Sequence, residues 1–151
     1  DASSYRALFA GPWSPVREPR MTILMPTNEA LSAYFTASNT TLAAVLANQT
    51  WVDRIVGAHV VPAQRLWMWD LMNIAAINTT VTTLAGTQLR VETDLESVWL
   101  ITPSGKRALV SSLSDAGGGI AGCAYGWWGP GQMSECADKP VVGQSVDTVL
   151  L

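Results

Sequence analysis

The sequence predicts a single domain of the α+β class, and three observations lead to this prediction. Helical apolar stripes occupy the first half of the chain, strand-like runs with turn signals occupy the second half, and 151 residues suffice for one hydrophobic core. Elements segregated in this way favour α+β over a parallel repeat of βαβ units. Hydrophobic residues make up 48% of the chain and charged residues only 14%, which excludes a disordered polypeptide.

The first half is expected to begin with a short strand and to continue as helices. Residues 21–25 are an apolar run of strand length that Pro26 ends. A helix with an apolar stripe follows, and its N-cap is expected within residues 27–28. A second cap within residues 40–41 precedes two more helical stripes, which we expect to end at Gly57, a natural C′ residue.

The second half is expected to consist mainly of strands and tight turns. Residues 59–61 read as a brief strand that Pro62 ends, and residues 66–72 are either a buried helical turn or an ordered loop. Turn signals then separate strand-like runs into two hairpins, and residues 141–151 read as a closing strand. The paired runs are residues 80–84 with 88–92, and residues 98–101 with 107–111.

Two segments lack a regular pattern. Residues 1–20 contain three prolines and are expected to form an irregular arm ahead of a domain at residues 21–151. The second segment is a glycine- and tryptophan-rich insertion at about residues 115–139, bracketed by Cys123 and Cys136. Two cysteines without a nearby histidine cannot complete a tetrahedral zinc site, which leaves two free thiols or one disulfide.

Three N-glycosylation sequons favour secretion. They begin at Asn39, Asn48 and Asn78, and each has a threonine at its third position. Three such triplets in a short chain indicate the oxidising secretory pathway, where a disulfide between Cys123 and Cys136 would form. The expected location is therefore extracellular, secreted or associated with a cell surface.

Charge and hydropathy exclude two classes of partner. No apolar run reaches the about 18 residues that a membrane helix needs. The net charge of −3 and the scattered basic residues argue against nucleic acid.

Four segments, in this order along the chain, resemble the fasciclin domain family. Their sequences are TILMPTNEAL at residues 22–31, IVGAHVVP at 55–62, TLAGTQLRV at 83–91 and VVGQSVDTVLL at 141–151. The resemblance implies an α+β fold with a sandwich or wedge of strands and several short helices packed on it. It also implies a non-enzymatic extracellular adhesion or assembly module of a larger matrix, cell-wall or surface-appendage glycoprotein, acting by protein–protein contacts.

The sequence departs from the family pattern at three places. The residue before His59 is Ala58, where the family often has the tyrosine linked to integrin-dependent adhesion in its animal members. The closing strand has Gln144 or Ser145 in place of a second histidine, and residues 114–140 hold an insertion where the family usually has a short link. The first two departures weaken the expectation of integrin binding, and the insertion marks a place for a partner of this member's own.

The single histidine limits the catalytic possibilities. His59 would have to serve any Ser-His-Asp or Cys-His arrangement, but its place in an apolar stretch favours a packed, structural histidine. Asp70 could be a buried carboxylate, although a turn cap or contact with water is favoured. Glu92, Asp94 and Glu96 alternate as calcium ligands could, but a solvated strand end is favoured. We therefore expect no enzymatic activity, no cofactor and no metal site.

Seven tryptophans indicate binding through exposed aromatic side chains. Trp51 and Trp99 lie in apolar periodic segments and are assigned to the core. The first binding candidates belong to the insertion, whose glycines cannot bury them; the alternative is that this loop folds back over a sheet edge. The candidates, in order, are Tyr125, Trp127 and Trp128, then Trp67 and Trp69, then Trp13.

The expected partner is an extracellular protein or polysaccharide, together with other domains of the same chain. The arm at residues 12–20 could dock onto such a neighbouring domain. A carbohydrate-binding module that uses the exposed aromatic residues of the disulfide loop is the alternative function.

Overall fold

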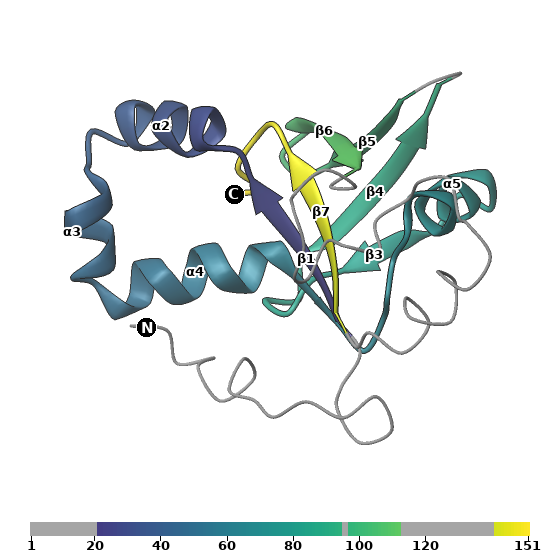
Figure 1. The fold of residues 1–151 in the computed structure, drawn as a ribbon, viewed down its shortest axis with the longest axis horizontal. Helices are drawn as coiled ribbons and strands as arrows, with labels where there is room; N and C mark the ends of the chain where they lie inside the picture. Colours follow the sequence, from purple (N-terminus) through teal and green to yellow (C-terminus); the bar gives the residue numbers. More distant parts are fainter. Residues whose placement is uncertain (1–20, 95–96, 113–140) are drawn as a thin grey trace, which may run out of the picture.

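The computed structural model describes residues 21–94, 97–112 and 141–151 (Figure 1). Seven strands in these ranges form one sheet in the order β2-β1-β7-β6-β5-β4-β3. Neighbouring strands are antiparallel, except that β1 and β7 are parallel. The strands are β1 (Met21–Pro26), β2 (Val60–Pro62), β3 (Thr80–Thr82), β4 (Gln88–Thr93), β5 (Val98–Ile101), β6 (Arg107–Ser112) and β7 (Val141–Val146).

The helices lie in two groups. Helices α2 (Asn28–Ala37), α3 (Leu42–Leu46) and α4 (Gln49–His59) follow one another after β1 and extend away from the sheet on the left of Figure 1. Helix α5 (Met68–Ala76) packs instead against β3, β4 and β5. Segregated helices and a mostly antiparallel sheet confirm the α+β class, whereas the sandwich or wedge stays a prediction. None of the helices in the described part of the chain is long and apolar enough to span a membrane.

The two ends of the sheet approach each other. The backbone N–H of Leu84, in the turn after β3, donates to the carbonyl oxygen of Val60 in β2 at 2.7 Å. The next residue, Ala85, donates to the carbonyl oxygen of Gly57 in α4 at 2.9 Å. These bonds join elements from opposite ends of the strand order, so the sheet is nearly closed around its core.

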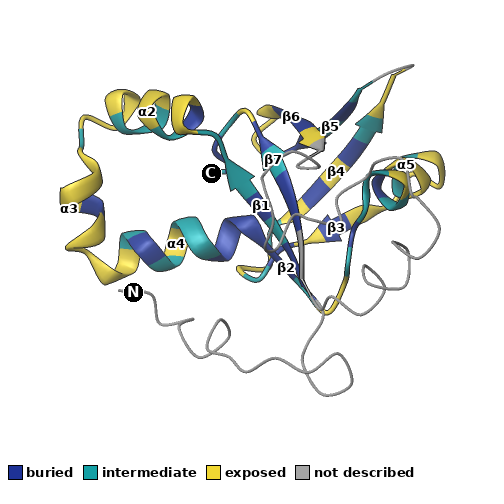
Figure 2. Ribbon diagram, in the orientation of Figure 1, coloured by how far each residue is buried: buried dark blue, intermediate teal, exposed yellow. Residues whose placement is uncertain are grey.

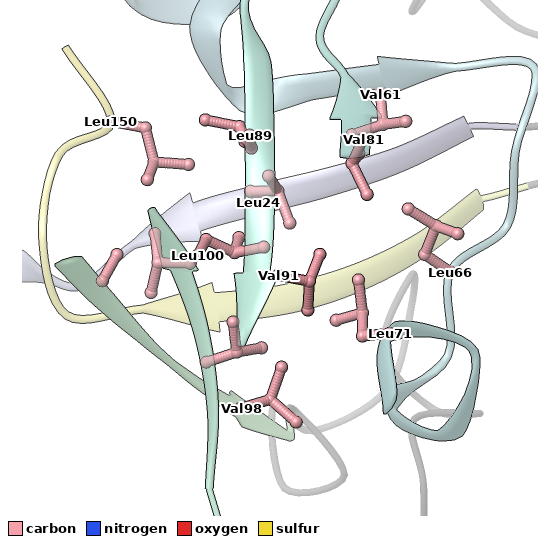
Figure 3. Packing of buried hydrophobic residues seen from close by; sticks show 13 residues of the cluster. Leu24, Val61, Leu66, Leu71, Val81, Leu89, Val91, Val98, Leu100 and Leu150 are labelled. Carbon is pink, nitrogen blue, oxygen red and sulfur yellow. The ribbon is translucent and has the colours of Figure 1, made fainter. Parts of the chain in front are cut away.

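The main hydrophobic core lies inside this curved sheet and beneath α5. Figure 3 shows leucines and valines from β1, β4, β5 and α5 pointing toward one another, with Leu71 of α5 beside Val91 of β4. The buried members of the cluster are Leu24, Val61, Leu66, Leu71, Val81, Leu89, Val91, Val98, Leu100, Ala108, Val110, Val146 and Leu150.

Both predicted hairpins are confirmed. Strand β3 pairs with β4, Val81 opposite Leu89, and β5 pairs with β6, Leu100 opposite Ala108. From Gln88 to Val91 in β4 the residues alternate between exposed and buried, because successive side chains of a strand point to opposite faces. The turn signals in the sequence therefore predicted the correct pairing.

The helix starts also follow from the sequence. Thr27 caps α2 by accepting a hydrogen bond from the backbone N–H of Ala30 at 3.1 Å, and Thr41 caps α3 in the same way through Ala44 at 3.2 Å. Each of these threonines is one of the two residues expected at its cap.

Two boundaries were predicted wrongly: the junction of α4 with β2, and the end of the closing strand, because β7 ends at Val146 and not at Leu151. Helix α4 does not end at Gly57 but continues to His59, so His59 closes a helix and does not begin a strand. Gly57, Ala58 and His59 are all buried, and this tertiary packing overrides the tendency of glycine to end a helix. Residues 66–72 were expected as a buried helical turn or an ordered loop, and from Met68 onward they are helical, as the first part of α5, which extends to Ala76.

Candidate functional site on helix α5

The structure describes two of the predicted binding residues. Trp67 is the half-buried N-cap residue of α5, and Trp69 lies in the first turn with 54% of its surface exposed. The other predicted site residues in the arm and the insertion lie outside the described ranges. They are Trp13, Cys123, Tyr125, Trp127, Trp128 and Cys136.

The start of α5 is fixed by a side-chain cap. The backbone N–H of Trp67 donates to Oδ2 of Asp70 at 2.9 Å. The carboxylate lies in the first turn, where the helix dipole favours negative charge. Asp70 therefore caps the helix, whereas the sequence favoured a turn cap or contact with water without deciding between them.

Helix α5 is apolar on two faces. On its inner face Leu71 is fully buried, while Ile74 and Ala75 pack against the core. On its outer face Trp69 and Met72 are three positions apart and both are exposed. Surface helices usually present polar residues to water, so this outer face resembles an exposed apolar patch at an interaction site.

An open hollow of about 640 Å³ lies beside this outer face. One side is formed by residues 63–67, which connect β2 to α5, and the other side by α5 itself. Its lining residues include Trp69, the polar Gln64 and Asn73, and the exposed Ile77. The hollow thus combines apolar surface with hydrogen-bonding groups.

The connecting segment is held by two buried polar residues of the sheet. Thr22 of β1 donates through its hydroxyl to the carbonyl oxygen of Gln64 at 2.9 Å and accepts from the N–H of Leu66 at 2.7 Å. Gln144 of β7 donates through Nε2 to the carbonyl oxygen of Leu66 at 3.1 Å. Neither Thr22 nor Gln144 has exposed surface, so this side of the hollow is anchored to the centre of the sheet.

This anchoring role was not predicted from the sequence. A polar threonine within the apolar run 21–25 was the available signal, and so was a glutamine within an apolar closing strand. Buried polar side chains usually have hydrogen-bond partners, but the partners here lie 42 to 78 positions away in the sequence.

His59 is buried, and both of its ring nitrogens contact the backbone. Nε2 accepts from the N–H of Leu150 at 3.0 Å, so Nδ1 carries the ring proton and donates to the carbonyl oxygen of Ile55 at 2.7 Å. Burial lowers the pKa of His59 below its ordinary value of 6.5, and the bond to Ile55 offsets part of that effect. The imidazole joins α4 to the C-terminal end of the chain.

Trp51 and Trp99 are half-buried, so their assignment to the core was wrong. Val98 and Leu100 take the inward positions of β5, which turns Trp99 to the opposite face of the sheet. There the guanidinium of Arg107 lies 4.4 Å from the centroid of the indole ring, in cation–π contact.

The three sequon asparagines are exposed. Asn39 follows α2, Asn48 is the N-cap of α4, and Asn78 follows α5. Of these three residues, Asn78 lies closest in sequence to the apolar outer face of α5.

Comparison with known proteins identifies the family. The family model of the Fasciclin domain matches residues 10–120, and no curated protein matches the chain. The match includes the segments 22–31, 55–62 and 83–91, whereas 141–151 lies beyond it. In the structure these three segments form the junction of β1 with α2, the junction of α4 with β2, and the β3–β4 hairpin. The chain therefore belongs to the fasciclin domain family.

Proposed function

We propose that this fasciclin domain is a non-enzymatic extracellular adhesion or assembly module that acts by protein–protein contacts, and that the outer face of α5 is part of its contact surface. Fasciclin domains are generally adhesion modules without enzymatic activity, which supports the class of function. The observation that carries the choice of surface is the exposure of Trp69 and Met72 on a helix whose opposite face is buried in the core.

The chemistry of this surface suits a protein partner. Tryptophan anchors contribute a large share of binding energy at protein interfaces, and methionine adapts to irregular apolar partners. The cap at Asp70 and the anchoring of residues 63–67 hold the surface in one conformation. A pre-organised surface loses little conformational entropy on binding.

The aromatic residues of the insertion remain candidates for the same surface. Val141, where the chain returns from the insertion, pairs with Met21, and Met21 also pairs with Pro62. Pro62 leads directly into residues 63–67 beside the hollow. The proposal keeps Tyr125, Trp127 and Trp128, and then Trp13 of the arm, as further contact residues on the basis of their aromatic chemistry.

We assign the domain to the outside of the cell, secreted or bound to a cell surface, as one module of a larger glycoprotein. The family and the three exposed sequons support this location. In that environment Cys123 and Cys136 would form a disulfide, which closes the aromatic insertion into a loop. The partners would be extracellular proteins and neighbouring domains of the same chain.

A matched pair of substitutions tests the contact surface. Trp69 and Leu46 are equally exposed at 54%, but Leu46 lies on α3, away from the sheet. Beads coated with the secreted protein should adhere to one another or to native extracellular material. Trp69→Ala should abolish most of this adhesion, and Leu46→Ala should leave it unchanged. Equal adhesion of the two variants would refute the assignment of the surface to α5.

A carbohydrate ligand is the second candidate, because an aromatic residue, Trp69, and two amide residues, Gln64 and Asn73, line the same hollow. An aromatic ring can pack against the apolar face of a sugar while amide groups bind its hydroxyls. Soluble oligosaccharides should then change the tryptophan fluorescence of the wild type and not that of Trp69→Ala. If adhesion depends on Trp69 while no glycan of a broad panel changes the fluorescence, the protein partner is favoured.

A further inference from the structure

The chain after α5 reverses direction at a sequon. Asn78 has a φ of 53°, in the left-handed region. Its N–H donates to the carbonyl oxygen of Ala75 at 3.1 Å, and the N–H of Thr79 donates to that of Ile74 at 3.2 Å. This is the Schellman arrangement, in which the residue with positive φ is usually glycine and sometimes asparagine.

Asn39 ends α2 in the same way. Its φ is 50°, its N–H donates to the carbonyl oxygen of Thr36 at 3.1 Å, and the N–H of Thr40 donates to that of Phe35 at 2.9 Å. Two sequons of identical sequence, Asn-Thr-Thr, therefore have the same backbone geometry at two distant helices.

Helix capping explains an asparagine at position 78 but not the rest of the sequon. Glycine would satisfy the positive φ at least as well, and the cap makes no use of a threonine two residues later. Thr80 is exposed in β3 and completes an accessible acceptor triplet. Both Asn78 and Thr80 thus meet the requirements of glycosylation in addition to those of the turn.

The surroundings of Asn78 are apolar. Ile77, the preceding residue, is 72% exposed, which is the largest exposed fraction among the large hydrophobic residues in the described ranges. Ile77 also lines the hollow beside α5. Trp69 lies nine positions before Asn78, or about 13 Å along a helix that rises 1.5 Å per residue. A glycan on Asn78 would therefore begin beside Ile77 and shield it more than it shields Trp69.

We infer that Asn78 carries an N-glycan and that this glycan covers the Ile77 end of α5, so that the contact surface is limited to the part around Trp69 and Met72. In the transfer step, Nδ2 of Asn78 forms a bond to the anomeric carbon of an oligosaccharide that is linked through a diphosphate to a lipid carrier. The bond between that carbon and the carrier oxygen breaks, Nδ2 loses a proton, and the lipid diphosphate leaves. The role in limiting the contact surface rests on the proposed function, whereas glycosylation and the covering of Ile77 do not.

Glycine substitutions separate the glycan from the helix cap. Asn78→Gly removes the acceptor while keeping a residue that adopts a positive φ without strain. Asn39→Gly makes the same change at the equivalent turn after α2. Each full chain would be secreted from a glycosylating host and also produced in a host that lacks N-glycosylation. The probes are intact mass and the fluorescence of 8-anilinonaphthalene-1-sulfonate, a dye that reports exposed apolar surface.

From the glycosylating host, Asn78→Gly should lose the mass of one glycan and bind more dye than the wild type. Asn39→Gly should bind the dye like the wild type, whatever its change in mass. When produced in the host that lacks N-glycosylation, the wild type and Asn78→Gly should bind equal amounts of dye. Adding Ile77→Ser to Asn78→Gly should reverse the increase.

Two results would overturn the inference. Absence of glycan mass at Asn78 in the secreted wild type would refute the modification. Glycan mass at Asn78 with unchanged dye binding in Asn78→Gly would refute the covering of Ile77. Neither result depends on a binding partner, so the adhesion assay with Trp69→Ala can fail or succeed independently.

Discussion

Helices α3 and α5 expose apolar side chains to a similar extent but differ in what lies beneath them. Leu42 and Leu46 of α3 are 55% and 54% exposed, close to the value for Trp69 of α5. Helix α3 has five residues, of which only Val45 is buried, and it packs against α4. Figure 2 shows this region largely in the exposed colour, whereas α5 has a buried side toward the sheet. Exposed apolar area alone therefore does not identify a contact surface.

Helix α5 is also anchored more firmly than α3. The segment before α5 is bonded to β1 and β7 through Thr22 and Gln144, and Leu71 fixes the helix to the core. The segment before α3 is the exposed turn that contains Asn39. A surface that keeps its shape without its partner binds with a smaller entropic cost, which favours α5. This comparison predicts that substitutions near α5 have larger effects than equivalent substitutions near α3 and α4.

The largest effect is expected from Leu71→Ala. The substitution removes a fully buried side chain from the core and leaves a cavity, which should lower the free energy of unfolding by about 2–5 kcal/mol. Met72→Ala, on the outer face of the same helix, should change it by less than about 1 kcal/mol. Chemical denaturation monitored by circular dichroism measures both. Similar losses for the two variants would show that α5 is not anchored through its inner face.

The next effect concerns the segment beside the hollow. Thr22→Val keeps the shape of the side chain but removes its bonds to Gln64 and Leu66, leaving a buried N–H without its acceptor. We expect a loss of about 1–3 kcal/mol and faster hydrogen exchange at the Leu66 amide. The control is Thr82→Val, an exposed threonine of β3, which should change neither quantity. Unchanged exchange at Leu66 would remove the argument that the sheet holds the hollow in place.

His59 tests whether the end of α4 belongs to the anchored part of the molecule. Burial keeps the folded-state pKa below the unfolded value of 6.5, so the unfolded chain binds a proton first as the pH falls. Neutral, buried His59 therefore makes its full contribution to the free energy of unfolding above pH 6.5. That contribution is lost as the pH falls below 6.5 toward the folded-state pKa, by at most about 1.4 kcal/mol per pH unit.

The free energy of unfolding of wild type and His59→Gln can be measured by denaturation between about pH 5.5 and 8. Ordinary carboxyl groups titrate below this range, so the pH dependence that differs between the two proteins is that of His59. The variant should be less stable at neutral pH, because glutamine does not reproduce both backbone bonds, and should show a flatter pH dependence. The same pH slope in both proteins would contradict the coupling of His59 to folding.

The sequence predicted local features well and distant contacts poorly. The caps at Thr27 and Thr41 and the two hairpins depend on residues within a few positions of one another, and they are confirmed. The end of α4 was misplaced because burial of His59 depends on Leu150, 91 positions away. Local propensity carries no information about such contacts.

The same distinction applies to the candidate site. Trp67 and Trp69 are candidates from the sequence because aromatic residues are frequent at interfaces, and their role in binding stays a prediction. The half-burial of the tryptophans in β5 and α4 could not be predicted in this way. Trp99 and its neighbours Val98 and Leu100 are all apolar, so the run did not reveal which residues face inward. The anchoring role of Gln144 could not be predicted because it depends on the pairing of β1 with β7, two strands far apart in the sequence.

The smallest effects on the free energy of unfolding are expected from removing helix caps. The same kind of capping hydrogen bond occurs at the start of α5 and at the start of α4, so the two regions can be compared directly. Asp70 accepts from Trp67 at 2.9 Å in a partly buried site, while Asn48 accepts from the N–H of Trp51 at 3.3 Å in an exposed one. Loss of a cap costs about 0.5–2 kcal/mol, so Asp70→Ala should fall toward the upper end and Asn48→Ala toward the lower end.

Asn48→Asp completes the comparison, because aspartate retains the capping oxygen but cannot carry an N-glycan. In protein without glycans its free energy of unfolding should equal that of the wild type within about 0.5 kcal/mol. The three variants can be measured by thermal unfolding in one buffer. If Asn48→Ala proved as costly as Asp70→Ala, the start of α4 would be as firmly coupled to the core as α5. The exposed leucines of α3, next to that cap, would then be as well held as Trp69, and the preference for α5 would rest on its aromatic side chain alone.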